Sequence, residues 1–286
     1  MSASAPVAAE RHEAHRGYEV GAHMAGRLSR RDPRPLSQGE LVPGAKRPFD
    51  SFPTFISRAR GATIWDVDGN EYVDFLLGYG PVILGHNHPE VQEAVRRSLD
   101  DAVCQTPFWS PTQVELVERL GEVIPGAEMA FILRTGSDAT SCAVRIARIF
   151  TQRQTIVRAG YNGWHDWSNP FDAGIPPSVR ALTQVVDVND VAALDTAVDA
   201  AGEDLAAIVT MPYEHDVPDV AALQHAADLA HSRNALFVLD EVRSGFRIAL
   251  GGAQEHLGIR ADLVCLSKAM ANGYSISAVT GSAALL

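Results

Sequence analysis

Short apolar runs alternate with amphipathic stretches from residue 129 to residue 266, and this alternation narrows the fold more than any other pattern. The runs are Met129–Leu133, Thr155–Arg158, Thr183–Val186, Ala206–Thr210, Ala235–Leu239 and Leu263–Leu266. Helical spacing fills several intervals, notably Asp138–Phe150, Asp190–Ala200 and Val220–Arg233. Strands that alternate with helices predict an α/β fold with a mostly parallel sheet flanked by helices. Because such sheets bind ligands at the carboxyl ends of their strands, we expect the chemistry just after each run.

The segment before residue 129 carries its own signals. Residues 1 to about 50 are rich in Ala, Arg, Pro and Gly, which predicts a mobile arm with one short helix around Tyr18 to Leu28. A β-hairpin is predicted over Ala62–Trp65 and Glu71–Leu76, because Asp and Gly supply turn conformations between two β-rich flanks. Helical spacing then begins at Pro89 and again at Ser110-Pro111. The stretch 277–286 is apolar, and we assign it no element.

Charge and cysteine content exclude several classes of protein. The chain has 286 residues with 24 Lys+Arg and 35 Asp+Glu, a formal charge of −11, which disfavours binding to nucleic acid or to an anionic membrane. No apolar run approaches the roughly 20 residues that a membrane span needs. The N-terminus lacks the pattern of a secretory signal. Cys104, Cys142 and Cys265 fit neither a disulfide framework nor a zinc site, so we expect reduced thiols in a cytoplasmic protein without a metal.

A turn of small residues follows the first apolar run and precedes a helix. It reads Thr135-Gly136-Ser137-Asp138, and a helix N-terminus of this kind presents free backbone N–H groups that suit a phosphate. The same turn is also typical of an N-cap without a ligand. Taken alone, the residues favour the cap.

Charged residues come within two positions of the end of two other runs. Asp240 and Glu241 come after Leu239, and an ionised carboxylate there can hold a heteroaromatic ring nitrogen protonated. The alternative is that either acid caps the next element or pairs with Arg243 or Arg247. Lys268 follows Leu266, where desolvation beside positive charge would make it a Schiff-base nucleophile. The alternative for this lysine is a side chain that extends to solvent.

An aromatic residue completes the set. Tyr161 follows the run at Thr155–Arg158 and can stack on a planar cofactor, although a core aromatic is the usual explanation. The neighbouring His165 and Asp166 resemble an acid/base pair, but adjacent residues need not touch. The combination of phosphate turn, stacking aromatic, acid for a ring nitrogen and lysine supplies the functions that hold pyridoxal phosphate.

Three segments carry a family resemblance. Residues 79–89 (YGPVILGHNHP), 240–247 (DEVRSGFR) and 268–274 (KAMANGY) are similar to signatures of the class III, fold-type I pyridoxal-phosphate aminotransferases. Within that family the chain most resembles the glutamate-1-semialdehyde aminomutase branch, from about Pro48 to its end. The chain departs from the family where Asn162 replaces the usual His and where Met211-Pro212 replaces a Glu-Pro pair.

The resemblance implies a role for each matching position. Lys268 would form the Schiff base with pyridoxal 5′-phosphate, and Asp240 would face the pyridine nitrogen. Val242 and Tyr161 would pack on the two faces of the ring. The phosphate would be held by the turn residues Thr135, Gly136 and Ser137.

The resemblance also implies the activity and the domain plan. An amino group would move from a small-molecule amino donor to an oxo or aldehyde acceptor in a homodimer, with Lys268 as the proton shuttle. The alternatives are an intramolecular aminomutase and a non-catalytic remnant that binds cofactor or a partner subunit. Residues 1–85 would be the arm and a hairpin segment of the small domain, and residues 86–286 the cofactor-binding large domain. Family chains continue further, so we expect the C-terminal small domain to be missing here and transfer by residues 1–286 alone to be poor.

Overall fold

The computed structural model describes residues 19–28, 30, 55–101, 108–171, 173–213 and 217–286. The chain forms two compact units, one of Met1–Phe75 with Gly85–His88 and one of Leu76–Leu84 with Pro89–Leu286. The assignment of the two segments to a small domain and a cofactor domain stays a prediction. Cys104 lies outside the described residues.

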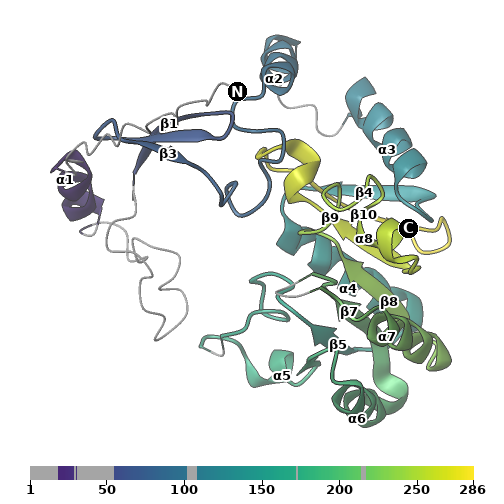
Figure 1. Cartoon of the computed structure of the whole chain (residues 1–286). Helices are drawn as coiled ribbons and strands as arrows, with labels where there is room; N and C mark the ends of the chain where they lie inside the picture. Colours follow the sequence, from purple (N-terminus) through teal and green to yellow (C-terminus); the bar gives the residue numbers. More distant parts are fainter. Residues whose placement is uncertain (1–18, 29, 31–54, 102–107, 172, 214–216) are drawn as a thin grey trace, which may run out of the picture. The chain divides into compact units, whose positions relative to one another are not determined.

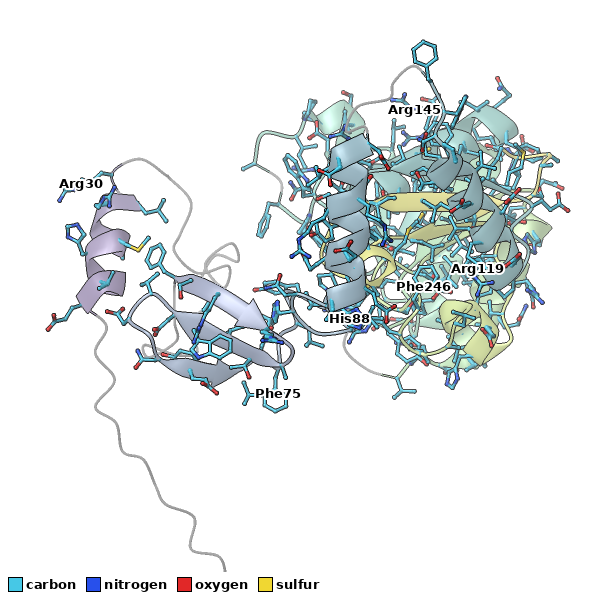
Figure 2. The ribbon with its side chains drawn as sticks, turned by 90° about the horizontal axis from the view of Figure 1, so that it is seen from above. Arg30, Phe75, His88, Arg119, Arg145 and Phe246 are labelled. Carbon is cyan, nitrogen blue, oxygen red and sulfur yellow. The ribbon has the colours of Figure 1, made fainter. Side chains whose placement is uncertain are left out.

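The first unit contains one helix and a small antiparallel sheet. Helix α1 covers Glu19–Leu28, and the strands β1 (Ile56–Arg60), β2 (Thr63–Asp66) and β3 (Glu71–Val73) pair in that order. The predicted helix and hairpin are thus confirmed, and β1 adds a strand that the sequence did not indicate. Phe75, directly after the sheet, is 91% exposed, and Figure 2 shows its ring projecting away from the ribbon.

Asp66 organises the hairpin turn. Its buried carboxylate accepts hydrogen bonds from the backbone N–H of Asp68 and Asn70, from the Asn70 amide and from the Tyr72 hydroxyl, at 2.8 to 3.0 Å. The neighbouring Asp68 carboxylate accepts the backbone N–H groups of Val20 and Gly21 at the start of α1. These two acids satisfy donors that a turn and a helix N-terminus would otherwise leave unpaired.

The second unit is built on a seven-stranded sheet of order β4-β10-β9-β8-β7-β5-β6 (Figure 1). The strands are β4 (Met129–Leu133), β5 (Thr155–Ala159), β6 (Thr183–Val186), β7 (Leu205–Thr210), β8 (Leu236–Asp240), β9 (Leu263–Leu266) and β10 (Ser277–Gly281). Every predicted run is a strand, and the pairs among β9, β8, β7, β5 and β6 are parallel. The predicted α/β fold with a mostly parallel sheet is confirmed.

Strand β10 is the exception in direction and in origin. It forms antiparallel ladders with β4 on one side and with β9 on the other. It comes from the apolar stretch to which the sequence assigned no element. Only the short 3-10 turn η3 (Lys268–Ala271) lies between β9 and β10. Because a parallel strand needs a longer crossover, usually a helix, the sequence showed no sign of a further strand here.

Helices cover both faces of this sheet (Figure 1). The helices of the second unit are α2 (Pro89–Asp101), α3 (Pro111–Val123), α4 (Gly136–Thr151), α5 (Pro177–Arg180), α6 (Val191–Ala201), α7 (Val220–Ser232) and α8 (Gly252–Leu257), with a 3-10 turn η2 at Gly202–Asp204. Helix α4 packs on one face, while α6 and α7 pack on the other against β5, β7 and β8. Among the described residues, no helix combines the length and the apolar character that crossing a membrane requires.

The central strands are buried on both faces. All six residues of β7 and all five of β8 are buried, and side chains alternate between the two cores, as Phe237 and Val238 do. Burial on both faces requires near-continuous apolar sequence, which is why the runs were readable as strands. Polar groups are therefore displaced to the strand ends.

Candidate functional site

The candidate site lies where strands β4, β5, β8 and β9 end. Asp240 is the last residue of β8 and is paired in register with Cys265 of the neighbouring strand β9. Lys268 follows Cys265 three positions later, at the start of η3. The two charged residues that the sequence singled out therefore leave adjacent strands at the same edge of the sheet.

Asp240 is buried and held by two donors. Its Oδ2 accepts the Asn162 side-chain N–H at 2.9 Å, and its Oδ1 accepts the backbone N–H of Val242 at 3.1 Å. Burial raises the pKa of Asp240 to about 6, while the bonds from Asn162 and Val242 and the charge of Lys268 oppose this shift. The carboxylate is thus ionised above about pH 6 and has an orientation fixed by both oxygens.

Glu241 has a different role from its neighbour. Its carboxylate accepts the backbone N–H groups of Ala253 and Gln254 at 2.5 and 2.8 Å and the Ser244 hydroxyl at 2.9 Å. Burial raises the pKa of Glu241, against these three hydrogen bonds. The capping alternative is therefore correct for Glu241, whereas Asp240 caps no helix.

Lys268 has an unusual backbone and a perturbed side chain. Its φ is +45°, in the left-handed region that a non-glycine residue adopts only where the surroundings hold it. Desolvation lowers the pKa of the half-buried Lys268, and repulsion from Arg243 and Arg247 adds to this effect against the attraction of Asp240. A lysine with a lowered pKa supplies the neutral amine more readily, as a nucleophile requires.

The N-terminus of α4 provides the third part of the site. Thr135 is the N-cap residue. Its hydroxyl accepts the backbone N–H of Asp138, and the Asp138 carboxylate accepts the backbone N–H of Thr135. Within the described residues, no hydrogen bond uses the backbone N–H groups of Gly136 and Ser137. The N-cap alternative is correct for the Thr135 side chain, and it leaves two N–H groups open to an anion.

Close packing joins this turn to the end of β8. A Cβ placed on Gly136 would lie 2.6 Å from Val242 Cγ1, a distance that real Cβ atoms do not show. Only glycine therefore allows α4 to approach Val242 this closely. Gly136, Ser137, Asp240 and Val242, predicted from separate motifs, share one small region.

The loop after β5 brings the aromatic residue to the same edge. Tyr161 is half exposed, and the adjacent Asn162 is buried on Asp240. Gly163 has a φ of +112°, and a Cβ there would lie 2.6 Å from Ser137 Oγ. The loop thus packs directly on the first turn of α4, which places Tyr161 beside the region that holds Asp240.

A cavity of about 740 Å³ lies beside Tyr161. Its lining includes Tyr161, Arg158, Met211 and residues of the loops after β5 and β6, but neither Asp240 nor Lys268. The cavity is therefore a neighbour of the candidate site and does not contain its charged groups.

His165 does not form the acid/base pair with Asp166 that the sequence suggested as one reading. Its Nδ1 lies 2.7 Å from Ser141 Oγ on α4, and its Nε2 lies 4.0 Å from Asp138. The histidine thus ties the loop to the helix. Among the described residues, no group of three or more His, Cys, Asp or Glu side chains is arranged to hold a metal ion.

Two site residues had no assigned role at the sequence level. Asn162 was noted only as a departure from the family pattern, and Thr140 was not singled out. Thr140 is buried, and its hydroxyl donates to the Asn162 carbonyl oxygen at 2.6 Å. A small polar residue on the buried side of α4 was the available signal, because such residues need a partner.

The geometry fits pyridoxal phosphate. Two open N–H groups at a helix N-terminus suit its phosphate, and glycine at position 136 lets this turn pack against Val242. A buried acid with its carboxylate fixed suits a protonated ring nitrogen, and a lysine with a lowered pKa suits its aldehyde. Residues with these functions converge from four strand ends.

Comparison with known proteins agrees with this fit. The family model described as aminotransferase class III matches residues 45–286. A 3-aminobutyryl-CoA aminotransferase of Cloacimonas acidaminovorans (strain Evry) is 39% identical over an alignment of 256 residues, which covers 85% of this chain and 62% of the relative.

Solved structures agree as well. The FumI protein of Sphingopyxis sp. MTA144, in its PLP internal aldimine form, superposes with a TM-score of 0.83 at 34% identity, over 92% of this chain and 65% of that one. A β-phenylalanine aminotransferase of Variovorax paradoxus gives 0.74 at 27% identity, over 93% and 64%. The chain spans less than two thirds of each of these three proteins. By its matched family model and its relatives, this chain belongs to the class-III aminotransferases, whose cofactor is pyridoxal phosphate.

Proposed function

We propose that this chain carries the cofactor site of an aminotransferase that moves an amino group from an amino donor to an oxo or aldehyde acceptor. The observation that carries the proposal is the placement of Asp240 and Lys268 at the paired ends of β8 and β9. One buried acid and one lysine with a lowered pKa meet beside an open helix N-terminus.

Each predicted residue then has a task. The backbone N–H groups of Gly136 and Ser137 bind the phosphate, with the Thr135 cap fixing the turn. Tyr161 and Val242 flank the ring on its two faces. Pyridoxal phosphate, when bound, supplies an electron sink for the pair of electrons left when a substrate carbon loses its proton.

The two charged residues act on opposite ends of the ring. The Asp240 carboxylate keeps the ring nitrogen protonated, because an anion in a desolvated site strongly favours a neighbouring cation. Lys268 Nζ would hold the cofactor, and once the amine of the donor has replaced it there, the freed Nζ would take up the proton that leaves the amino-bearing carbon of the substrate. Its lowered pKa increases the share of the amine that is neutral and able to accept that proton.

The relatives support a substrate class. The names of two of them, a 3-aminobutyryl-CoA aminotransferase and a β-phenylalanine aminotransferase, describe amino groups on the carbon β to an acyl group. We therefore propose a donor whose amino group lies outside the α-position. An aminomutase reaction and a non-catalytic remnant are the alternatives, and we propose a cytoplasmic homodimer for the whole protein.

Reductive trapping tests the assignment of the lysine. The protein is incubated with pyridoxal phosphate, reduced with borohydride, digested and mapped by mass spectrometry. We expect the pyridoxyl group on Lys268, and a Lys268→Ala variant that carries no label. A label on another lysine would overturn the assignment.

A donor screen tests the reaction. The whole protein is incubated with a panel of α- and β-amino donors and an oxo acceptor. Conversion of the bound cofactor to its amine form by a β-amino donor supports the aminotransferase. Exchange within a single substrate would support the aminomutase, and trapping without any transfer would support the remnant.

A further inference from the structure

The side chain of Asn162 makes a contact with Asp240 that the motifs in the sequence did not indicate. Its side chain is 1% exposed, and its Nδ2 donates to Asp240 Oδ2 at 2.9 Å. The reverse amide orientation would place two oxygens against each other, so the carboxylate itself fixes which way the amide points. The amide oxygen of Asn162 has no hydrogen-bond partner among the described residues. The contact with Asp240 is thus the one that the side chain makes.

The backbone of Asn162 is fixed from the opposite side. Thr140, 1% exposed on α4, donates its hydroxyl to the Asn162 carbonyl at 2.6 Å and lies 3.2 Å from the Ser137 carbonyl. Gly163 lets the loop approach Ser137 without a Cβ between them. A hydrogen-bonded path therefore runs from α4 through Asn162 to Asp240.

We propose that Asn162 is a positioning residue for Asp240, which holds the carboxylate in one orientation and favours its ionised form. The inference rests on the proposed function only for its effect on the cofactor. A hydrogen bond donated to a carboxylate is stronger when the carboxylate is charged. Without it, a fully buried acid would shift further toward its neutral form.

The effect of Asn162 on Asp240 can be separated from the effects of the other groups around this carboxylate. Lys268 on η3 favours the charge, while Glu241 on the same strand end and the buried Cys265 of β9 lie close enough to interact with it. Among these groups the side chain of Asn162 alone cannot titrate. The Asn162 contribution should therefore follow the ionisation of Asp240 and no other event.

A stability measurement on the cofactor-free protein provides the first test. Asn162→Leu removes the hydrogen-bond donor. The decrease in Tm of this variant relative to the wild type is measured at about pH 8, where Asp240 is ionised, and at about pH 4.5, where Asp240 is mostly protonated. We expect the loss to be larger at the higher pH by roughly 3 °C or more. In an Asp240→Asn background this pH-dependent part should vanish. Asn162→Ala serves as a second variant if the leucine does not fold.

A matched control comes from the same loop. Asn169 donates to the Trp164 carbonyl and accepts the Phe171 N–H, so its amide serves the loop alone. Asn169→Leu should lower Tm equally at both pH values. An equal loss for Asn162→Leu at both pH values would overturn the proposal, because a merely structural residue behaves in that way.

Cofactor affinity provides the second test. We expect Asn162→Leu to weaken binding of pyridoxal phosphate about tenfold at about pH 8, and Asn162→His, which restores an N–H donor, to recover most of it. Unchanged affinity in the leucine variant would overturn the consequence for the cofactor. If the wild type binds no cofactor while the pH-dependent loss of Tm persists, the proposed function fails and the role of Asn162 toward Asp240 stands.

Discussion

The Glu241 carboxylate accepts the backbone N–H of Gln254 at 2.8 Å and thereby caps a helix that begins well beyond it in the sequence. The N-cap position itself is Gly251, which has no side chain to do this. Gln254 in turn donates to the Pro125 carbonyl and accepts the Ala261 N–H. One buried acid thus fixes the short helix α8 under the end of β8.

Removal of this cap should be costly. Glu241→Ala leaves the N–H groups of Ala253 and Gln254 and the Ser244 hydroxyl without an acceptor in a buried region. We expect a loss of about 3 kcal/mol in the free energy of unfolding, measured with denaturant. Glu118→Ala, exposed on α3, is the control and should change stability by less than about 0.5 kcal/mol. A small effect at Glu241 would mean that α8 finds other acceptors.

Two glycines at the ends of α8 allow the cost of a left-handed backbone to be measured separately from the cost of a steric clash. Gly252 has a φ of +76°, and a Cβ there would collide with the Glu241 carboxylate. Gly258 has a φ of +68° with no atom within 4 Å of such a Cβ. Gly258→Ala should cost about 1 kcal/mol from its backbone alone, and Gly252→Ala at least about 2 kcal/mol more. Equal thermal shifts for the two variants would contradict the close approach of Glu241.

The buried Asp240 should lower the stability of the cofactor-free protein at neutral pH. Because burial raises its pKa from 3.8 to about 6, the folded chain holds this proton more tightly than the unfolded chain does. Stability from this group is therefore present below about pH 4 and is lost as the pH rises to about 6. Asp240→Asn should be more stable than the wild type at about pH 8, by roughly 2–3 kcal/mol, and nearly equal to it at about pH 4.

The cofactor should reverse this order. When pyridoxal phosphate is added, the wild type should gain thermal stability and Asp240→Asn should gain much less, because the ring cation has lost its counter-ion. Calorimetry of both proteins over the pH range, with and without cofactor, checks both parts. A stability difference that does not vary with pH would show that Asp240 is not the titrating group.

Asp66 gives a prediction confined to the first unit. Burial raises the pKa of Asp66, but its hydrogen bonds with Asn70, Tyr72 and Asp68 outweigh this and lower it overall. Its stabilisation is therefore present above about pH 4 and is lost as the pH falls through the lowered value. Asp66→Ala should speed hydrogen exchange at the Asn70 amide about tenfold, a change of roughly 1.4 kcal/mol. Glu71→Ala, which loses only an exposed bond from the Trp65 indole, should leave that amide protected.

The strands that the sequence predicts most directly are those buried along their whole length, because each one is visible as a continuous apolar run. Strand β7 is buried at every position, so its six residues had to be apolar or small, and the run was visible without its neighbours. Strand β10 was not visible in this way, because its pairing with β4 and β9 depends on a reversal of direction that no residue encodes locally.

The site follows the same rule. Asp240 and Lys268 could be named because each stands at the end of a buried run, Asp240 directly after Leu239 and Lys268 two residues after Leu266. The role of Asn162 could not be named, and the capping role of Glu241 could not be chosen over its alternatives, because both depend on contacts across the sheet edge and into a helix farther along the chain. Residue type and local spacing leave such contacts open, and tertiary structure alone shows that Glu241, and not Asp240, caps a helix.

The antiparallel strand β10 has a consequence for synthesis on the ribosome. β4 is an edge strand whose one neighbour is β10, with Met129 opposite Gly281, so it leaves the ribosome long before its partner exists. Its apolar residues Met129 and Phe131 are half exposed even when β4 is paired with β10. Contacts this distant in sequence form late, and an unpaired apolar strand is prone to aggregate in the interval. The nascent chain should therefore depend on holding chaperones until residue 281 has emerged.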